Sequence, residues 1–140
     1  MFDHVLLNVS SRKESMKFYT PVLQVLGIKA MYDQDEYTAY GTHSFHFWLH
    51  QSNKEDVTRK MHLAFSADSR KQVDEFYQAA LAAGGRSNGA PGLREHGPNY
   101  YAAYVLDFED QVIARWRLEL SRQTHSNSPA VRTLLIGQSF

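Results

Sequence analysis

Two stretches of the chain, residues 4–27 and 62–85, match each other without a gap. They share an initial His, a Ser-Arg-Lys triplet, a Phe-Tyr pair, a Leu and a final Gly. At 140 residues the chain is long enough for one compact domain but short for two ordinary ones. We therefore expect a single domain whose two halves repeat one structural unit.

Each copy begins with a strand pattern and continues with a helix pattern. Residues 2–9 alternate as in a strand, with Val5, Leu7 and Val9 on one face and His4, Leu6 and Asn8 on the other. Ser11 then opens a capping box, and an apolar stripe at helical spacing runs on to Gly27. The second copy repeats the same order from His62.

Three further strands are predicted after each helix. They are residues 28–32, 37–40 and 45–50 in the first half and, in the second, a short strand near Arg86 followed, after a loop at 88–99, by residues 100–106 and 112–118. Each half thus has the order βαβββ, and the fold class is α+β. One such unit alone would leave an apolar sheet face in water. We therefore expect two units with their helices outside and their other sheet faces around a shared hollow, into which His4 and His62 point.

Changes in composition set the expected boundaries. Residues 51–60 are polar and charged, which is typical of a linker, and the chain beyond residue 118 becomes rich in Ser and Asn. The expected division is one domain over residues 1–118, with module one at 1–50, a linker at 51–60 and module two at 61–118, followed by a C-terminal tail at 119–140.

The composition restricts the function classes. Lys plus Arg equal Asp plus Glu, at 15 each, so no net charge attracts nucleic acid or an anionic membrane. The absence of Cys excludes disulfides, thiolate metal sites and a Cys nucleophile. No stretch reaches the length of about 20 apolar residues that a membrane helix needs, and no secretory signal is visible. We expect a cytoplasmic protein with neither nucleic acid nor membrane as partner.

Several short motifs, taken in order, resemble one known family. They are Asp3-His4-Val5, Phe18-Tyr19, Met61-His62-Leu63, Ala82-Ala83-Gly84-Gly85 and Tyr104-Val105-Leu106-Asp107. Their order and spacing resemble the vicinal oxygen chelate superfamily, which includes glyoxalase I, bleomycin-resistance proteins, fosfomycin-resistance enzymes and extradiol dioxygenases. Residues 88–94 and 99–103 further resemble a glyoxalase-like subgroup of bacterial proteins with no assigned reaction.

The resemblance implies two βαβββ modules that form an open, cup-shaped mixed β-barrel with the helices outside. In many members the cup holds a divalent metal, which chelates two oxygens of the substrate and acts as a Lewis acid. The resemblance places the metal ligands on the first, fourth, fifth and eighth strands. His and Glu ligands of this kind suit Zn, Ni, Mn or Fe.

The ligand positions implied by the resemblance are only half filled in this chain. His4 and His62 stand at the first- and fifth-strand positions, but Trp48 and Ala114 stand at the other two, and neither side chain ligates a metal. A catalytic zinc normally has three protein ligands. His46, His50 and His96 are the alternatives that would complete the set after a shift of a strand or loop. We therefore expect no resident cofactor, with a divalent metal bound by His4 and His62 as the alternative.

The residues expected to line the cup have polar tips or flat rings. They are His4, Trp48, His62, His96, Tyr100 and Tyr104. Each also has a purely structural interpretation: a neutral imidazole bonded to a tyrosine or to backbone, a Trp that fills the space of a missing metal, or strand tyrosines that pack at the rim. No catalytic residue is assigned from the sequence.

Three functions fit these residues. The favoured one is a metal-free protein that binds a small organic molecule, as the bleomycin-resistance proteins do. The alternative is a metal-dependent glyoxalase-like lyase or dioxygenase with His4 and His62 as ligands. A metal-free enzyme with His or Tyr as general acid or base ranks last, because no catalytic pair is readable. By analogy with the family, whose open cups often close against a second copy, we expect a homodimer.

Overall fold

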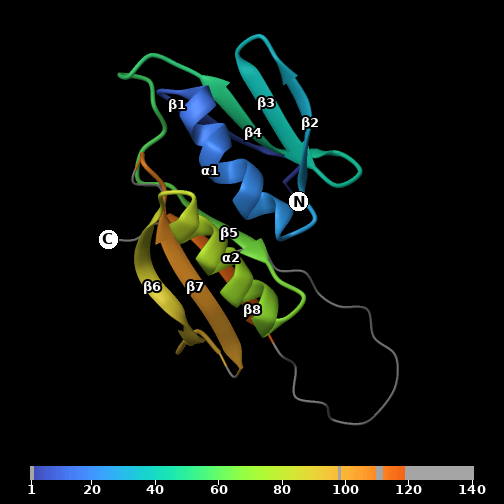
Figure 1. The fold of residues 1–140 in the computed structure, drawn as a ribbon, viewed down its shortest axis with the longest axis vertical. Helices are drawn as coiled ribbons and strands as arrows, with labels where there is room; N and C mark the ends of the chain where they lie inside the picture. The colour runs from blue at the N-terminus through green and yellow to red at the C-terminus, as the bar shows by residue number, and fades with distance from the viewer. Residues whose placement is uncertain (1, 98, 110–111, 119–140) are drawn as a thin grey trace.

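The computed structural model describes residues 2–97, 99–109 and 112–118 (Figure 1). Its elements are β1 (Val5–Val9), α1 (Arg12–Gln24), β2 (Lys29–Gln34), β3 (Tyr37–Gly41), β4 (Phe45–Gln51), β5 (His62–Ser66), α2 (Arg70–Ala82), β6 (Arg86–Leu93), β7 (Tyr100–Leu106) and β8 (Val112–Leu118). This is the order βαβββ twice, as the repeat predicts. Module one denotes β1 to β4 with α1, and module two denotes β5 to β8 with α2.

Each module forms one mixed four-stranded sheet. The strand orders are β1-β4-β3-β2 and β5-β8-β7-β6, and the first strand of each sheet runs parallel to its neighbour while the other pairs are antiparallel. In the first sheet Leu6 pairs with Trp48, and in the second Ala64 pairs with Ala114. Leu6 and Ala64 are equivalent in the sequence repeat, so Trp48 and Ala114 occupy equivalent places in the two modules.

The ends of both helices follow the sequence signals. The side chains of Ser11 and Ser69 each accept a hydrogen bond from the backbone N–H three residues on, at 3.3 and 3.1 Å. Gly27 and Gly84 follow the helices with φ of +72° and +91°. Only a residue without a side chain adopts this conformation at little cost, so these glycines stop the helices.

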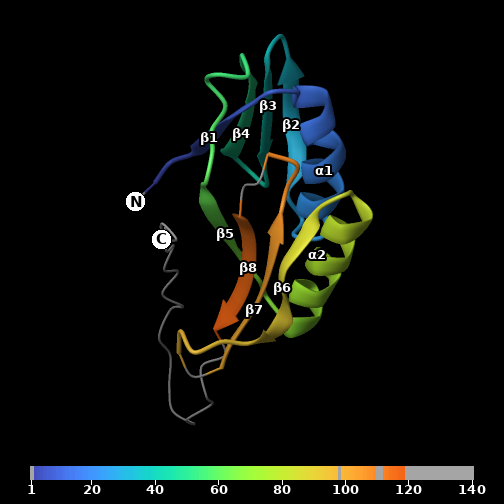
Figure 2. The same cartoon turned by 90° about the vertical axis from the view of Figure 1, so that its left-hand side faces the viewer.

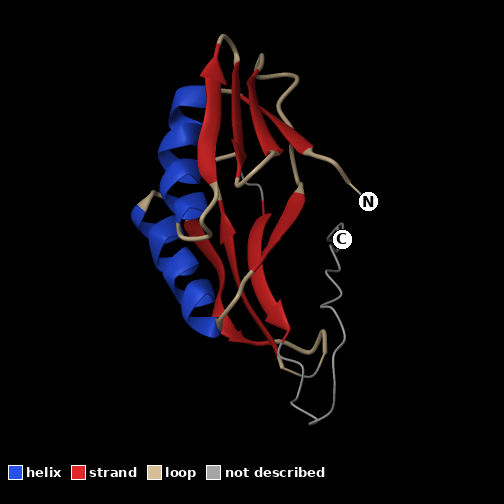
Figure 3. Cartoon of the chain, turned by 90° about the vertical axis from the view of Figure 1, so that its right-hand side faces the viewer, coloured by secondary structure: helices blue, strands red, loops and turns tan. Residues whose placement is uncertain are grey.

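The core lies between the helices and one face of each sheet. Both helices cover the same side of the molecule, and the sheets form the other layer (Figures 2 and 3). The buried residues include Leu7, Val9, Phe18, Val22, Leu23, Leu49, Leu63, Val73, Phe76, Ala80, Val105 and Ile113. Burial of a large aliphatic or aromatic side chain contributes about 1.5–3 kcal/mol. The apolar strand faces and helix stripes expected from the sequence therefore face each other.

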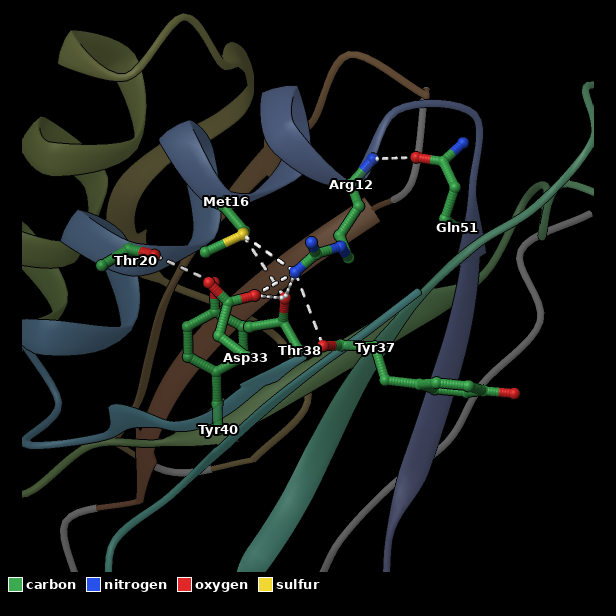
Figure 4. Close-up of polar contacts among 8 residues, drawn as sticks. All are labelled: Arg12, Met16, Thr20, Asp33, Tyr37, Thr38, Tyr40 and Gln51. Atoms are coloured by element: carbon green, nitrogen blue, oxygen red, sulfur yellow. Dashed lines mark hydrogen bonds and ion pairs between the residues drawn. The ribbon is translucent and has the colours of Figure 1, made fainter. Parts of the chain in front are cut away.

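Polar contacts fix the start of α1 to the β2–β3 hairpin (Figure 4). Arg12 Nη1 pairs with Asp33 and donates a hydrogen bond of 2.7 Å to the buried Thr38 hydroxyl. The backbone N–H of Arg12 donates to Gln51 Oε1 at 2.8 Å. The Arg12 charge is thus compensated within the fold, and the side chain acts as part of the scaffold.

One loop prediction is wrong. Residues 88–99 were expected to form a loop after a short strand, but β6 continues to Leu93 and pairs with β7. The pairing shifts register on both sides of Gly89, which has a φ of +150°, and Pro91 has no N–H to donate. An edge strand tolerates these residues, which in the sequence indicate a loop. The connection between β6 and β7 is therefore confined to residues 94–99.

No helix within the described part of the chain is long and apolar enough to cross a membrane. The expected tail at 119–140 lies outside the described residues.

Candidate functional site

The candidate site is the face of the two sheets opposite α1 and α2, here called the open side (Figure 3). On β1, Leu7 is buried against the helices while its neighbour Leu6 is 41% exposed. On β7, the Tyr101 hydroxyl donates to Asp74 of α2 at 2.8 Å, so Tyr104, three residues on, lies on the opposite face. Alternation along the strands thus assigns each side chain to the helix side or the open side.

A cluster of rings surrounds Trp48 on the open side of module one. Four rings from four different segments lie with centroids 5.4–6.5 Å from Trp48, and they belong to His4, Tyr32, Tyr37 and Phe45. These five residues are called the Trp48 cluster. Phe45 and Tyr37 are 40% and 37% exposed, although aromatic rings normally gain by burial. The cluster therefore presents flat apolar surface with polar tips to whatever lies on the open side.

The sequence did not identify three members of this cluster. Tyr32 and Tyr37 come from β2 and β3, and the register of these strands with β4 brings them to Trp48, whereas Phe45 lies on β4 itself. Alternation within a strand predicts which side of the sheet a residue faces, but it does not predict which residues of other strands it contacts. For Tyr32 and Tyr37 only the pairing between strands shows that they meet Trp48, and Phe45 lies where the register between β3 and β4 shifts.

The histidines of module one are engaged in local contacts. His4 Nδ1 lies 2.8 Å from the Asp3 carboxylate, and His50 Nδ1 lies 3.0 Å from Asn8 Oδ1. His50 also stacks on Tyr37, with ring centroids 4.4 Å apart. Such contacts orient the imidazoles without bringing their nitrogens to one point.

His46 has its own partners as well. Its Nε2 lies 2.9 Å from the Ser44 hydroxyl, and its Nδ1 lies 3.2 Å from the backbone carbonyl of Asp3. Both ring nitrogens are thus used by nearby groups. The completion of a metal site by a shift of β4, considered from the sequence, would have to break these contacts.

The residues present do not fit the metal that the resemblance implies. Among the described residues, no group of three or more His, Asp or Glu side chains comes together to hold an ion. His4 contacts the ring of Trp48, whereas His62 contacts that of Tyr104 in the other sheet. The side chain of Ala114 lies outside the description, and alanine has no donor atom. A catalytic zinc needs about three protein ligands, which this donor set does not supply.

A second cluster lies on the open side of module two. The ring of His62 is 6.0 Å from that of Tyr104, and the ring of His96 is 5.4 Å from that of Tyr100, all centroid to centroid. With Arg94, these four residues are called the His62 cluster. His96 lies in the connection between β6 and β7, and its ring contacts the first residue of β7.

Burial alters the acidity of two members of this cluster. It lowers the pKa of His62, and the neighbouring His96 lowers it further because two positive charges would repel. Burial, together with the adjacent Tyr104, raises the pKa of Tyr100 to about 12. At neutral pH both groups are therefore uncharged and able to donate hydrogen bonds.

Arg94 lies over Tyr104 in the same cluster. Its guanidinium carbon is 5.2 Å from the Tyr104 ring centroid, and Nη2 donates to the carbonyls of Ala90 and, at 3.3 Å, of Ala102. A side chain at Gly89 would place its Cβ 3.0 Å from Tyr104 Cδ2 and 3.3 Å from Arg94 Nη2. Gly89 therefore makes room for the stacked pair. Arg94 is a residue that the sequence did not assign to the site, because its stacking depends on the unexpected length of β6.

The six residues predicted to line the cup form two groups on the open side. His4 and Trp48 belong to the Trp48 cluster, and His62, His96, Tyr100 and Tyr104 to the His62 cluster. Their binding of a ligand stays a prediction. A separate hollow of about 320 Å³ lies near the two helices, away from the open side, and is lined by Glu14, Lys17, Phe18, Ala83, Gly84 and Phe108.

Comparison with known proteins gives a consistent family. Residues 1–119 match the model of the Glyoxalase/Bleomycin resistance protein/Dioxygenase superfamily. No curated protein matches the chain. Solved structures with the same fold include a glyoxalase/bleomycin resistance protein from Albidiferax ferrireducens T118, with 29% identity, a TM-score of 0.74 and coverage of 85% of this chain and 99% of that one.

Two more distant structures share the fold. One is a glyoxalase/bleomycin resistance protein/dioxygenase family enzyme from Burkholderia phytofirmans PsJN, with 21% identity, a TM-score of 0.65 and coverage of 81% of this chain and 95% of that one. The other is the genomically encoded fosfomycin resistance protein FosX from Listeria monocytogenes, with 16% identity, a TM-score of 0.64 and coverage of 89% and 98%.

Proposed function

The chain belongs to the glyoxalase/bleomycin resistance protein/dioxygenase superfamily, and from that premise we propose that it binds a small organic molecule on the open side without a complete metal site. The observation that carries the proposal is the Trp48 cluster, whose partly exposed rings lie on the open side. Ligand sites combine apolar and aromatic walls with a few polar groups. The two clusters of the open side have this composition.

The donor set supports binding without metal over metal-dependent chemistry. A glyoxalase-like lyase or a dioxygenase of this family would need further ligands beside His4 and His62. The described residues do not bring such a set together. The similar structures include proteins named for resistance to bleomycin or fosfomycin. Capture of a small organic molecule therefore fits the residues of this surface better than metal catalysis does.

We also propose that a second copy of the chain closes the open side into a cup. Leu6, Tyr37 and Phe45 are each more than a third exposed there. Apolar surface of this kind favours burial at an interface. Sedimentation at micromolar concentration is expected to give a dimer. A monomer would contradict this part of the proposal.

A thermal-shift screen tests the binding function. The chain is mixed with a panel of small organic molecules, in one series with a chelator and in another with Zn²⁺, Ni²⁺, Mn²⁺ or Fe²⁺. Ligands that bind the folded state raise the melting temperature. We expect stabilisation by some of the organic molecules in the chelator series, and loss of that stabilisation in Trp48→Ala. Stabilisation that requires a metal, and that His4→Ala abolishes, would contradict the proposal and favour the enzyme.

A further inference from the structure

We propose that the bound molecule carries a carboxylate, and that Arg94 binds this group with the help of the imidazoles of His62 and His96. This inference rests on the proposed function, since it names the class of ligand for the same open side. Its basis is the different environment of two arginines, Arg94 and Arg12.

The charge of Arg12 is compensated within the protein. Its Nη1 pairs with Asp33, and the Thr38 hydroxyl and a backbone carbonyl accept further hydrogen bonds (Figure 4). The carboxylate of Asp33 thus neutralises this guanidinium within the fold. Arg12 is therefore a structural residue, and it serves as the comparison for Arg94.

The charge of Arg94 has no such partner. Its Nη2 donates to two backbone carbonyls, but its buried Nε has no acceptor, and no carboxylate in the described part of the chain forms an ion pair with it. Glu95, the next residue, is exposed. A guanidinium in this position retains its charge and its capacity to bind an oxyanion.

The side chain of Arg94 is held in place before any ligand arrives. It lies over Tyr104, it is anchored to the carbonyls of β6 and β7, and Gly89 leaves the space that it occupies. Fixing a long side chain normally costs conformational entropy on binding. Here the fold has fixed it beforehand, so a ligand gains the interaction without that cost.

The surrounding groups favour a single negative charge. His62 and Arg94 both contact the ring of Tyr104, and His96 contacts the ring of Tyr100 on the same strand. At neutral pH the neutral His62 donates a hydrogen bond but adds no full positive charge. One fixed cation with neutral donors matches the charge of a carboxylate better than that of a phosphate or phosphonate dianion. The rings of Tyr100 and His96 offer surface for the organic part of the ligand.

Isothermal titration calorimetry with matched probes tests the inference. The probes are benzoate, 4-hydroxybenzoate and indole-3-acetate, the primary amide of each, and phenylphosphonate. The proteins are the wild-type chain, Arg94→Gln, Arg94→Lys and the control Lys71→Gln. Lys71 lies on α2, where it is 81% exposed beside Glu75, so its variant removes one positive charge away from the open side.

We expect at least one acid to bind roughly tenfold or more tightly than its amide, as charge-assisted hydrogen bonds imply. Lys71→Gln should keep this preference, Arg94→Gln should lose it, and Arg94→Lys should keep part of it, because lysine retains the charge without the planar fork. Equal binding of acid and amide by the wild type, a preference retained in Arg94→Gln, or tighter binding of phenylphosphonate than of benzoate would overturn the inference. Binding of amides alone would leave the proposed function standing, whereas absence of binding by all probes and by the wider screen would overturn both.

Discussion

The Tyr19 hydroxyl donates a hydrogen bond of 2.6 Å to Asp107 Oδ2, and this bond joins α1 of module one to the turn between β7 and β8 of module two. Both residues are buried. The same turn makes a second link, because the backbone N–H of Ser10 donates to Glu109 Oε1 at 2.7 Å. Burial, and then the negative charge of Asp107, raise the pKa of Tyr19 well above its usual range. These bonds help to set the position of the two sheets relative to each other.

Removal of the Tyr19 hydroxyl is therefore expected to destabilise the whole chain. Tyr19→Phe leaves a buried carboxylate without this donor, which costs about 1–3 kcal/mol of unfolding free energy. Tyr77, its equivalent in the repeat, donates to the Ser87 hydroxyl within module two at 2.7 Å. Tyr77→Phe leaves only a neutral hydroxyl unpaired and should cost about 1 kcal/mol or less.

Urea unfolding of both variants measures this difference. The prediction also includes a loss of cooperativity or a lower melting temperature in Tyr19→Phe, since the bond crosses between modules. Equal destabilisation by the two substitutions would show that the hydrogen bond between the modules contributes no more to the unfolding free energy than the bond within module two.

Gly89→Ala should disturb the stacked pair of Arg94 and Tyr104. The added Cβ would lie 3.0 Å from Tyr104 Cδ2, and the backbone φ of +150° is unfavourable for alanine. Gly97→Ala is the matched control, because Gly97 has a φ of +159° but nothing within 4 Å of the added Cβ. We expect Gly89→Ala to cost about 1–3 kcal/mol more than the control. Chemical denaturation of the two variants checks this, and equal costs would mean that the neighbours move aside freely.

Stability should fall as the pH drops below about 6.5, partly because of His62. The pKa of His62 is lowered in the folded chain by burial and by His96, so the unfolded chain binds more protons in this range. Protonation then favours unfolding, and stability lost on acidification returns as the pH rises. His62→Gln should show a shallower decline than the wild type between pH 7.5 and 5.5 in urea titrations. An unchanged dependence of stability on pH in His62→Gln would contradict the prediction that the lowered pKa of His62 contributes to this decline.

The elements of the fold were predictable where local sequence determines them. Ser11, Ser69, Gly27 and Gly84 act within a few residues of themselves, so the limits of both helices follow from the sequence. The sequence repeat predicted that the second half of the chain forms a second module of the same kind. The extent of β6 was not predictable, because Gly89 and Gly92 become strand residues only through pairing with β7.

The candidate site depends more than the helix ends do on pairing between segments that are distant in the sequence. The resemblance identified Trp48 and His62, but Tyr32 and Tyr37 reach Trp48 through the register of β2, β3 and β4. Contacts that cross the fold in this way leave no periodic pattern in the sequence. The same holds for Arg94, whose partners are two carbonyls and a ring on β6 and β7.

The emission of Trp48 during a ligand titration tests the central proposal most directly. The chain has two tryptophans, so Trp116→Phe leaves Trp48 as the single reporter and Trp48→Phe leaves Trp116 as the control. The titrant is the tightest binder of the thermal-shift screen, used in the presence of a chelator. The account predicts a saturable change in Trp48 emission with the same dissociation constant that calorimetry gives, and weaker binding by Trp48→Phe. Saturable binding by calorimetry that leaves the emission of Trp48 unchanged would contradict it.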